Sequence, residues 1–466
     1  MIIVKRLKEA YEANMDPFQF GFRQDRSTVE NLFIYSQLRR SSGKTLFALY
    51  VDLTAAFDKI PRRYLWEVIR KRTGADKLVN ILESLYKNNR GNIANSEIWY
   101  SIFGGTRQGG IESAPSFVFY FDFVLKVIRN RINKEIGDTG LEFKYNIDSQ
   151  LIAPRGDPDR ATKLNDIKRV TSLTYAHDLT ELSLDIKKLK RILKIMDEEC
   201  ARFGLYVSFK KTFTQEWAPG KDTPQSEPEK PLFEITDSKG NIHLIMNKQI
   251  FKALGLNIDN LDPDGHVTHR VAQAYAQFEK YRGVLTDWKI KRWIRKHYAE
   301  SFVRSALLYG INAQCPTEAQ IKKLSACWYN CLRQMSPGGF TTLKNEDGFD
   351  TPIFKYSNKD LDEYFDTPPI KDFIHVNFLQ YIGHIVRRPN SHPTKQALFI
   401  KPERSHAPTI FSKVRFLLNN ISQENIIRDM NDKVAFRTLL QTHFKYLKPR
   451  RRRRGTSQGQ VPVGSA

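Results

Sequence analysis

The clearest strand signal along the chain is the run TLFALYV, residues 45–51, which is apolar over the length of a strand. A continuous apolar run of this length predicts a strand that is buried on both faces. The run ends at Asp52. A carboxylate at the end of a buried strand is unfavourable unless it is paired or binds a metal, so Asp52 is a candidate functional residue or a helix cap.

A second signal is the stretch LTYAHDLTE, residues 173–181, in which two strand-like runs flank Ala176, His177 and Asp178. The spacing predicts a β-hairpin with these residues at its tip. His177 and Asp178 could be solvated turn residues, or they could be two ligands of a metal site.

Helical spacing follows the hairpin over residues 186–204, with Leu189, Leu193, Met196 and Cys200 on one face. The order of strand, helices, hairpin and helix predicts an α+β fold. If the strands of Asp52 and Asp178 are neighbours, both carboxylates can reach one pair of cations. Two-metal phosphoryl transfer requires such an arrangement of oxygen ligands.

The composition indicates which kind of molecule the protein binds. The 466 residues carry a net charge of +23, so polyanions are expected partners, with nucleic acid first and an acidic membrane surface second. No apolar run reaches the roughly 20 residues that span a bilayer, and the first residues lack the pattern of a signal peptide, so we expect an intracellular protein. Of the 4 cysteines, Cys327 and Cys331 fit a helix core better than a zinc site.

Several segments occur in an order that carries more information than any one of them: FQFGFRQDRSTVENLF, YVDLTAAFDKIPRRYLW, GGTRQGGIESAPSFVFYFDFV, LTYAHDLTELS, FGLYVSFKKT, FKALGLNI, SALLYGIN, KKLSACWYNCLRQM and LQYIGHIVRRPN. In this order they resemble the fingers, palm, primer-grip, thumb and post-thumb motifs of the reverse transcriptases of non-LTR (LINE-type) retrotransposons. The resemblance covers nearly the whole chain.

This resemblance implies a right-hand polymerase fold with a palm built on an antiparallel sheet, a helical thumb and a helical C-terminal region. The implied division is 1–45 partial fingers, 46–258 palm with fingers insertions, 259–340 helical thumb, 341–447 C-terminal helical region and 448–466 basic disordered tail. The implied activity is RNA-directed DNA polymerisation with two Mg²⁺ ions, an RNA template, a DNA primer and deoxynucleoside triphosphates.

The resemblance also implies roles for single residues. Asp52 and Asp178 correspond to metal-binding aspartates, and the carbonyl of Leu53 lies beside the first. Phe57 would be the steric gate against the ribose 2′-hydroxyl, and Gln108 and Gly109 would line the nucleotide pocket. Lys211 would lie near the leaving pyrophosphate. Arg23 and Arg26 would lie in the fingers, facing template or triphosphate. Each has an alternative without function: Phe57 as core, the glycines as a loop, and the charged residues as solvated surface.

His177 departs from the family pattern, because it stands where the first aspartate of the hairpin pair is expected. Imidazole offers one nitrogen without negative charge, which suits zinc or copper better than magnesium. One charge pair at 4 Å is worth about 4 kcal/mol at an effective dielectric near 20, or about three orders of magnitude in rate. We therefore expect very weak polymerase activity or none. His177 could be a metal ligand, a switch or a drifted position, and the chain could be a nucleic-acid-binding descendant or a retrotransposon remnant.

Both ends of the chain carry further expectations. The family has fingers segments and usually an endonuclease domain upstream of the first motif, so the resemblance suggests an N-terminally truncated copy. The arginine run near the C-terminus could be a solvated tail, a nuclear import signal or a non-specific phosphate contact: Arg450, Arg451, Arg452, Arg453 and Arg454.

Overall fold

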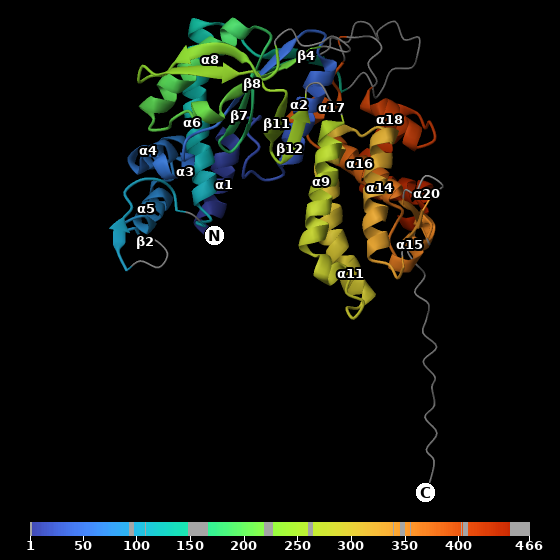
Figure 1. The fold of residues 1–466 in the computed structure, drawn as a ribbon. Helices are drawn as coiled ribbons and strands as arrows, with labels where there is room; N and C mark the ends of the chain where they lie inside the picture. The colour runs from blue at the N-terminus through green and yellow to red at the C-terminus, as the bar shows by residue number, and fades with distance from the viewer. Residues whose placement is uncertain are drawn as a thin grey trace, which may run out of the picture.

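The computed structural model describes residues 2–92, 97–107, 109–147, 166–218, 227–259, 264–338, 340–344, 350–354, 356–401, 403 and 409–447. Within these ranges the chain combines many helices with antiparallel strands (Figure 1). The α+β fold expected from the order of the elements is confirmed. Gln108 and the arginine run, residues 450–454, lie outside the described residues.

The central sheet has four antiparallel strands in the order β6-β7-β1-β8. Their bounds are β1 (Leu46–Val51), β6 (Ser172–Tyr175), β7 (Asp178–Ser183) and β8 (Phe213–Trp217). Five of the six residues of β1 are buried, as the apolar run predicted. In the register of β1 with β7, Val51 pairs with Leu179. Asp52 directly follows Val51, and Asp178 directly precedes Leu179, so the two aspartates meet at the same end of the sheet.

One face of the sheet packs against a core that includes Leu49, Val51 and Leu179. This core is built with the helices α1 (Ile2–Asn14), α3 (Ala56–Lys59), α4 (Arg62–Thr73), α5 (Asp76–Leu85), α6 (Ser113–Glu135) and α8 (Ile186–Arg202). The apolar stripe predicted for the helix after the hairpin is confirmed, because all four of its members are fully buried in α8: Leu189, Leu193, Met196 and Cys200.

The opposite face of the sheet, with Ala48, Tyr50 and Leu182, packs against α2 (Thr28–Ser41). The same continuous core extends into the C-terminal helices α16 (Ile370–Val386), α17 (Pro393–Leu398), α18 (Ile410–Leu417), α19 (Gln423–Asn431) and α20 (Lys433–His443). α17 lies directly beside α2 although more than 350 residues separate them in sequence (Figure 1). The C-terminal helices therefore extend, beyond α2, the core that lies on this face of the sheet.

A third core belongs to the helices between the sheet and the C-terminal region. They are α9 (Gly265–Lys280), α10 (Arg282–Leu285), α11 (Arg292–Tyr298), the π-helical segment Ala299–Arg304, α12 (Ser305–Leu308), α13 (Ile311–Gln314), α14 (Glu318–Gln334) and α15 (Asn358–Phe365). Figure 1 shows α9 extending away from the sheet, with α11 at its far end. Cys327 and Cys331 are buried in this core as free thiols, in line with their predicted position.

Among the described residues, five two-stranded antiparallel sheets accompany the central sheet. They pair β2 (Arg90–Asn92) with β3 (Trp99–Ser101), β4 (Leu141–Tyr145) with β5 (Asp166–Val170), β9 (Pro231–Thr236) with β10 (Ile242–Met246), β11 (Ile250–Ala253) with β12 (Leu256–Asp259), and β13 (Phe340–Lys344) with β14 (Asp350–Phe354). Short 3₁₀ helices span Phe209–Lys211 and Lys445–Leu447. Within the described ranges, no helix has the length and apolar character needed to cross a membrane.

Candidate active site

Three side chains that could hold a cation converge at the end of β1 and β7. One ligand atom from each of Asp52, His177 and Asp178 lies within 4.8 Å of the other two. The Nε2 of His177 is 3.9 Å from Oδ1 of Asp52. Asp52 therefore shares one site with His177 and Asp178, although more than 120 positions separate it from them in the sequence.

The hairpin turn places His177 and Asp178. β6 and β7 pair up to Tyr175 and Asp178, so Ala176 and His177 alone form the turn. Ala176 has a φ of 56°, in the left-handed region that two-residue hairpin turns need at their first position. Glycine normally supplies this conformation, because a Cβ makes it unfavourable. The turn thus holds a strained residue directly before the two site residues.

Lys211 reaches the site from the 3₁₀ helix that precedes β8. The amide of Ser208 donates to the Asp52 carbonyl at 2.8 Å, which aligns this segment with the end of β1. Lys211 Nζ then lies 3.0 Å from Oδ2 of Asp52. Leu53 forms a bridge with Val207 through the neighbouring Asp52 carbonyl and Thr54 amide, so the Leu53 carbonyl takes no part in that bridge.

The electrostatics of the site follow from this geometry. Partial burial raises the pKa of the Asp178 carboxyl, His177 lowers it, and the nearby Asp52 carboxylate raises it again. Lys211 contributes a smaller lowering of the same pKa. An aspartate at position 177 would add a third carboxylate to the two aspartates and one lysine of this cluster.

The His177 ring is fixed among aromatic side chains. It meets Phe57 edge-on at a centroid distance of 5.7 Å and Phe117 at 6.3 Å. Its Nδ1 is buried and makes no hydrogen bond with any described residue. Histidines that bind metals usually donate their second ring nitrogen to an acceptor, and this partner is missing here among the described residues.

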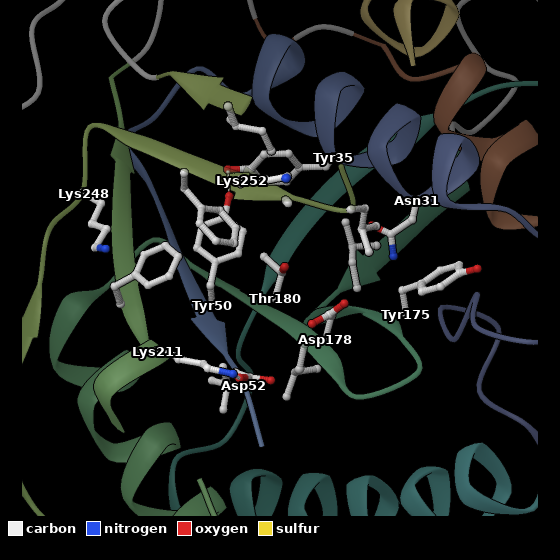
Figure 2. Close-up of a pocket in the computed structure, with 18 of the residues that line it drawn as sticks. Asn31, Tyr35, Tyr50, Asp52, Tyr175, Asp178, Thr180, Lys211, Lys248 and Lys252 are labelled. Carbon is white, nitrogen blue, oxygen red and sulfur yellow. Dashed lines mark hydrogen bonds and ion pairs between the residues drawn. The ribbon is translucent and has the colours of Figure 1, made fainter. Parts of the chain in front are cut away.

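The site opens into a cleft of about 600 Å³ between the sheet and the β11–β12 hairpin. Figure 2 shows Asp52 and Asp178 at one end of this cleft, with Lys211 beside Asp52. The lining also contains the aromatic side chains of Tyr35, Tyr50, Tyr175, Phe213 and Phe251, and the cationic side chains of Lys210, Lys248 and Lys252. Cations beside aromatic faces suit a nucleic-acid strand.

A second cavity, of about 380 Å³, shares Asp52, His177 and Lys211 with the cleft. It is lined by two of the predicted nucleotide-pocket residues, Phe57 and Gly109. Phe57 stacks on Phe117 at a centroid distance of 4.2 Å, which fixes the ring. Gly109 has a φ of 79° with nothing within 4 Å of an added Cβ, so its backbone conformation rather than lack of space favours glycine.

Arg23 and Arg26 lie outside both cavities and hold the segment around them together. The Arg23 side chain is only 5% exposed and pairs with Glu12 at 2.8 Å. Arg26 donates to the Pro17 carbonyl at 2.6 Å and lies over the Phe20 ring. Burial, with a smaller effect of Arg23, lowers the pKa of Arg26 to about 10. Neither guanidinium is directed into the shared site.

Several site residues carry no distinctive signal in the sequence. Arg107 lines the second cavity and pairs with Glu112 at 2.8 Å. In the sequence, only its position between two pairs of glycines suggested a place at the site. Lys252 lies on β11, within the segment FKALGLNI that resembles a primer grip, and Lys248 lies just before β11. No local pattern marks Lys248. Gln19 contacts the hairpin turn, as described below.

Residues 1–258 match the model of the family described as Reverse transcriptase (RNA-dependent DNA polymerase). The comparison with curated proteins gave no match.

Solved structures of telomerases from two Candida species are similar to the chain. Apo telomerase from Candida tropicalis truncated from its C-terminal domain is 12% identical over 56% of this chain and 44% of its own, with a TM-score of 0.35. Apo telomerase from Candida tropicalis is 9% identical over 86% and 62%, with a TM-score of 0.39. Telomerase from Candida albicans with a TWJ fragment of telomeric RNA is 12% identical over 72% and 53%, with a TM-score of 0.32. The chain spans 44% to 62% of the length of these telomerases.

Proposed function

Because the chain belongs to the reverse transcriptase (RNA-dependent DNA polymerase) family, we propose that it is an RNA-directed DNA polymerase of the non-LTR retrotransposon type. His177 makes its catalysis weak or absent. The observation that carries this proposal is the convergence of Asp52, Asp178 and Lys211 at the end of the sheet, between a nucleotide-sized cavity and a cation-lined cleft.

The residues present do not fit a pair of magnesium ions. Two-metal sites need carboxylate oxygens that bridge ions roughly 3.5–4 Å apart. His177 supplies one nitrogen and no negative charge, and the Lys211 ammonium already lies 3.0 Å from Oδ2 of Asp52. The three ligand atoms can converge on one divalent cation, but the carboxylate needed for a second is missing among the described residues.

The other side chains retain the roles of a nucleotide site. Phe57, fixed by its stack on Phe117, forms the wall that a ribose 2′-hydroxyl would strike. Gly109 and Leu53 also line this cavity, and Gln108, which lies outside the described residues, keeps the nucleotide-pocket role that the family resemblance implies. Lys211 places a positive charge where the phosphates of an incoming nucleotide would approach Asp52. Arg23 and Arg26 act on this site through the fingers segment that they hold in place.

The proposed partners are an RNA template, a DNA primer and deoxynucleoside triphosphates. The lysines of the cleft face the space where a primer strand would end beside Asp178. In this proposal residues 1–45 form partial fingers, 46–258 the palm, 259–340 the thumb and 341–447 a C-terminal helical region. The basic tail at 448–466 adds non-specific phosphate contacts or a nuclear import signal.

A second candidate is an inactive descendant that still binds nucleic acid. The buried, unpartnered Nδ1 of His177 favours this candidate, because a histidine selected as a metal ligand would have an acceptor for that nitrogen.

Primer extension on an RNA template tests both candidates. The variants are the natural chain, His177→Asp and the doubly substituted His177→Asp/Asp52→Asn, each with Mg²⁺ and with Mn²⁺. We expect His177→Asp to extend the primer about a thousandfold faster than the natural chain, since one pair of opposite charges, a carboxylate and a cation, at about 4 Å is worth about 4 kcal/mol at an effective dielectric near 20.

The double variant should return to background, which shows that the signal comes from this site. Equal extension by the natural chain and His177→Asp would refute the charge argument. Template–primer binding without extension by either chain would favour the second candidate.

A further inference from the structure

Gln19 belongs to the segment that runs along the hairpin that carries His177 and Asp178. The Phe20 amide donates to the Thr174 carbonyl at 2.8 Å, and the Thr174 amide donates to the Phe18 carbonyl at 3.0 Å. Residues 18–20 therefore pair with β6 in parallel, with Gln19 opposite Thr174. Gln19 is 1% exposed, so its amide side chain must find its partners inside the protein.

The partners of the Gln19 side chain are on the backbone of the turn. Its Oε1 accepts from the Ala176 amide at 2.9 Å and from the Gly21 amide at 2.8 Å. Its Nε2 donates to the Ala176 carbonyl at 3.2 Å. One side chain thus binds both the N–H and the C=O of a single turn residue.

Ala176 is the residue whose conformation needs support. Its φ of 56° is uncommon for a residue with a Cβ, and its carbonyl belongs to the peptide unit that leads into His177. The orientation of this peptide sets the direction in which residues 177 and 178 project. Holding both polar groups of Ala176 therefore controls how these side chains meet Asp52.

Gly21 provides independent evidence that the backbone of this segment packs closely against the turn. A Cβ added to Gly21 would lie 2.2 Å from the Ala176 nitrogen and 2.8 Å from its Cα. No other amino acid fits without moving one of the two backbones. The Gln19 amide reaches the turn because Gly21 permits this close approach.

We propose that Gln19 is a positioning residue of the candidate active site. It fixes the hairpin turn so that residues 177 and 178 stand with Asp52 around one cation position. The proposal relies on the proposed function only for the identity of that site. Polar groups that orient metal ligands typically change metal affinity by about 10- to 100-fold when they are removed.

The test uses the full-length His177→Asp chain as the parent, with Gln19→Ala and Gln19→Glu added separately. Glutamate keeps the acceptor for the Ala176 amide but loses the donor to the Ala176 carbonyl. The control is Tyr120→Phe, which removes a buried hydrogen bond to the Phe203 carbonyl at 2.8 Å, away from the turn. Two readouts are followed: hydrogen exchange in peptides that contain Ala176, and Mn²⁺ binding by titration with electron paramagnetic resonance.

We expect Gln19→Ala to accelerate exchange in the Ala176 peptides selectively and to weaken Mn²⁺ binding about tenfold or more. Gln19→Glu should fall between Gln19→Ala and the parent, and Tyr120→Phe should leave Mn²⁺ binding unchanged. Unchanged Mn²⁺ affinity in Gln19→Ala would overturn the proposal, whether exchange is unchanged or uniformly faster across the protein. Absence of primer extension in every variant would count against the proposed polymerase and would leave both readouts intact.

Discussion

Glu181 makes stability depend on pH in a direction opposite to most carboxylates. It lies on β7, 4% exposed, opposite Leu49 of β1 and Ser172 of β6. Burial is the largest cause that raises its pKa, from the ordinary 4.5 to about 7, while Arg129 lowers it and Asp16 raises it. The charged form is therefore less stable in the folded protein than in the unfolded chain.

The sign and size follow from proton linkage. Between the unfolded pKa of 4.5 and the folded pKa of about 7, the folded protein binds the proton more tightly, so stability falls as pH rises through this window. A difference of roughly 2.5 units corresponds to about 3 kcal/mol. The destabilisation is fully present above pH 7 and absent below the unfolded pKa. Glu181→Gln should be about 3 kcal/mol more stable than the natural chain at pH 8 and nearly equal to it at pH 4.5.

Urea unfolding followed by tryptophan fluorescence at pH 4.5, 5.5, 7 and 8 measures this difference. The matched control is Glu424→Gln, which makes the same substitution at an exposed glutamate on α19. If Glu181→Gln and the natural chain show parallel pH profiles, the Glu181 carboxylate is stabilised in its charged form and the reasoning from burial fails.

Three further predictions concern other parts of the molecule. In the His177→Asp background, Phe57→Ala should reduce discrimination against ribonucleoside triphosphates by about ten- to a hundredfold, measured as the ratio of kcat/KM values; an unchanged ratio would place the gate elsewhere. Asp122→Ala should lower the free energy of unfolding by about 3–5 kcal/mol, because it removes the carboxylate 2.8 Å from the largely buried Arg72 and leaves that charge only backbone acceptors, and Asp122→Asn should lower it less; a loss below 1 kcal/mol would contradict this. Replacing Arg450–Arg454 with glutamines should reduce the dependence of log Kd for RNA on log salt by up to about 0.7 per arginine, and an unchanged slope would show that the tail makes no phosphate contact.

Patterns that are local in sequence predicted the parts of the fold that depend on local burial. The apolar run at 45–51 and the runs that flank residue 176 are strands of the central sheet, because the apolar residues that the sequence displays in each run are the side chains that the fold buries. The four-residue stripe of α8 is buried for the same reason. The meeting of Asp52 with residues 177 and 178 could be anticipated only by supposing that their strands are neighbours.

The sequence did not predict contacts between separate segments of the chain. Arg23 looks like a surface charge, yet Glu12 from the preceding helix and two backbone carbonyls enclose its guanidinium. Gln19 has no charge and no repeat, and its partner is 157 residues away. No periodicity could place α17 beside α2, because that contact depends on how the whole C-terminal region folds back.

This folding back has a consequence for synthesis on the ribosome. The central sheet and α2, which covers the face with Ala48 and Leu182, are complete once β8 has been made at residue 217, but the C-terminal helices that extend this core end only with α20 at residue 443. At about 5–20 residues per second, translation of the intervening segment takes roughly 11 to 45 s. During that time the nascent chain exposes the apolar face of α2 that the C-terminal helices cover in the complete protein. A chain that stops near residue 258 would keep that face exposed and need a chaperone or partner to stay soluble.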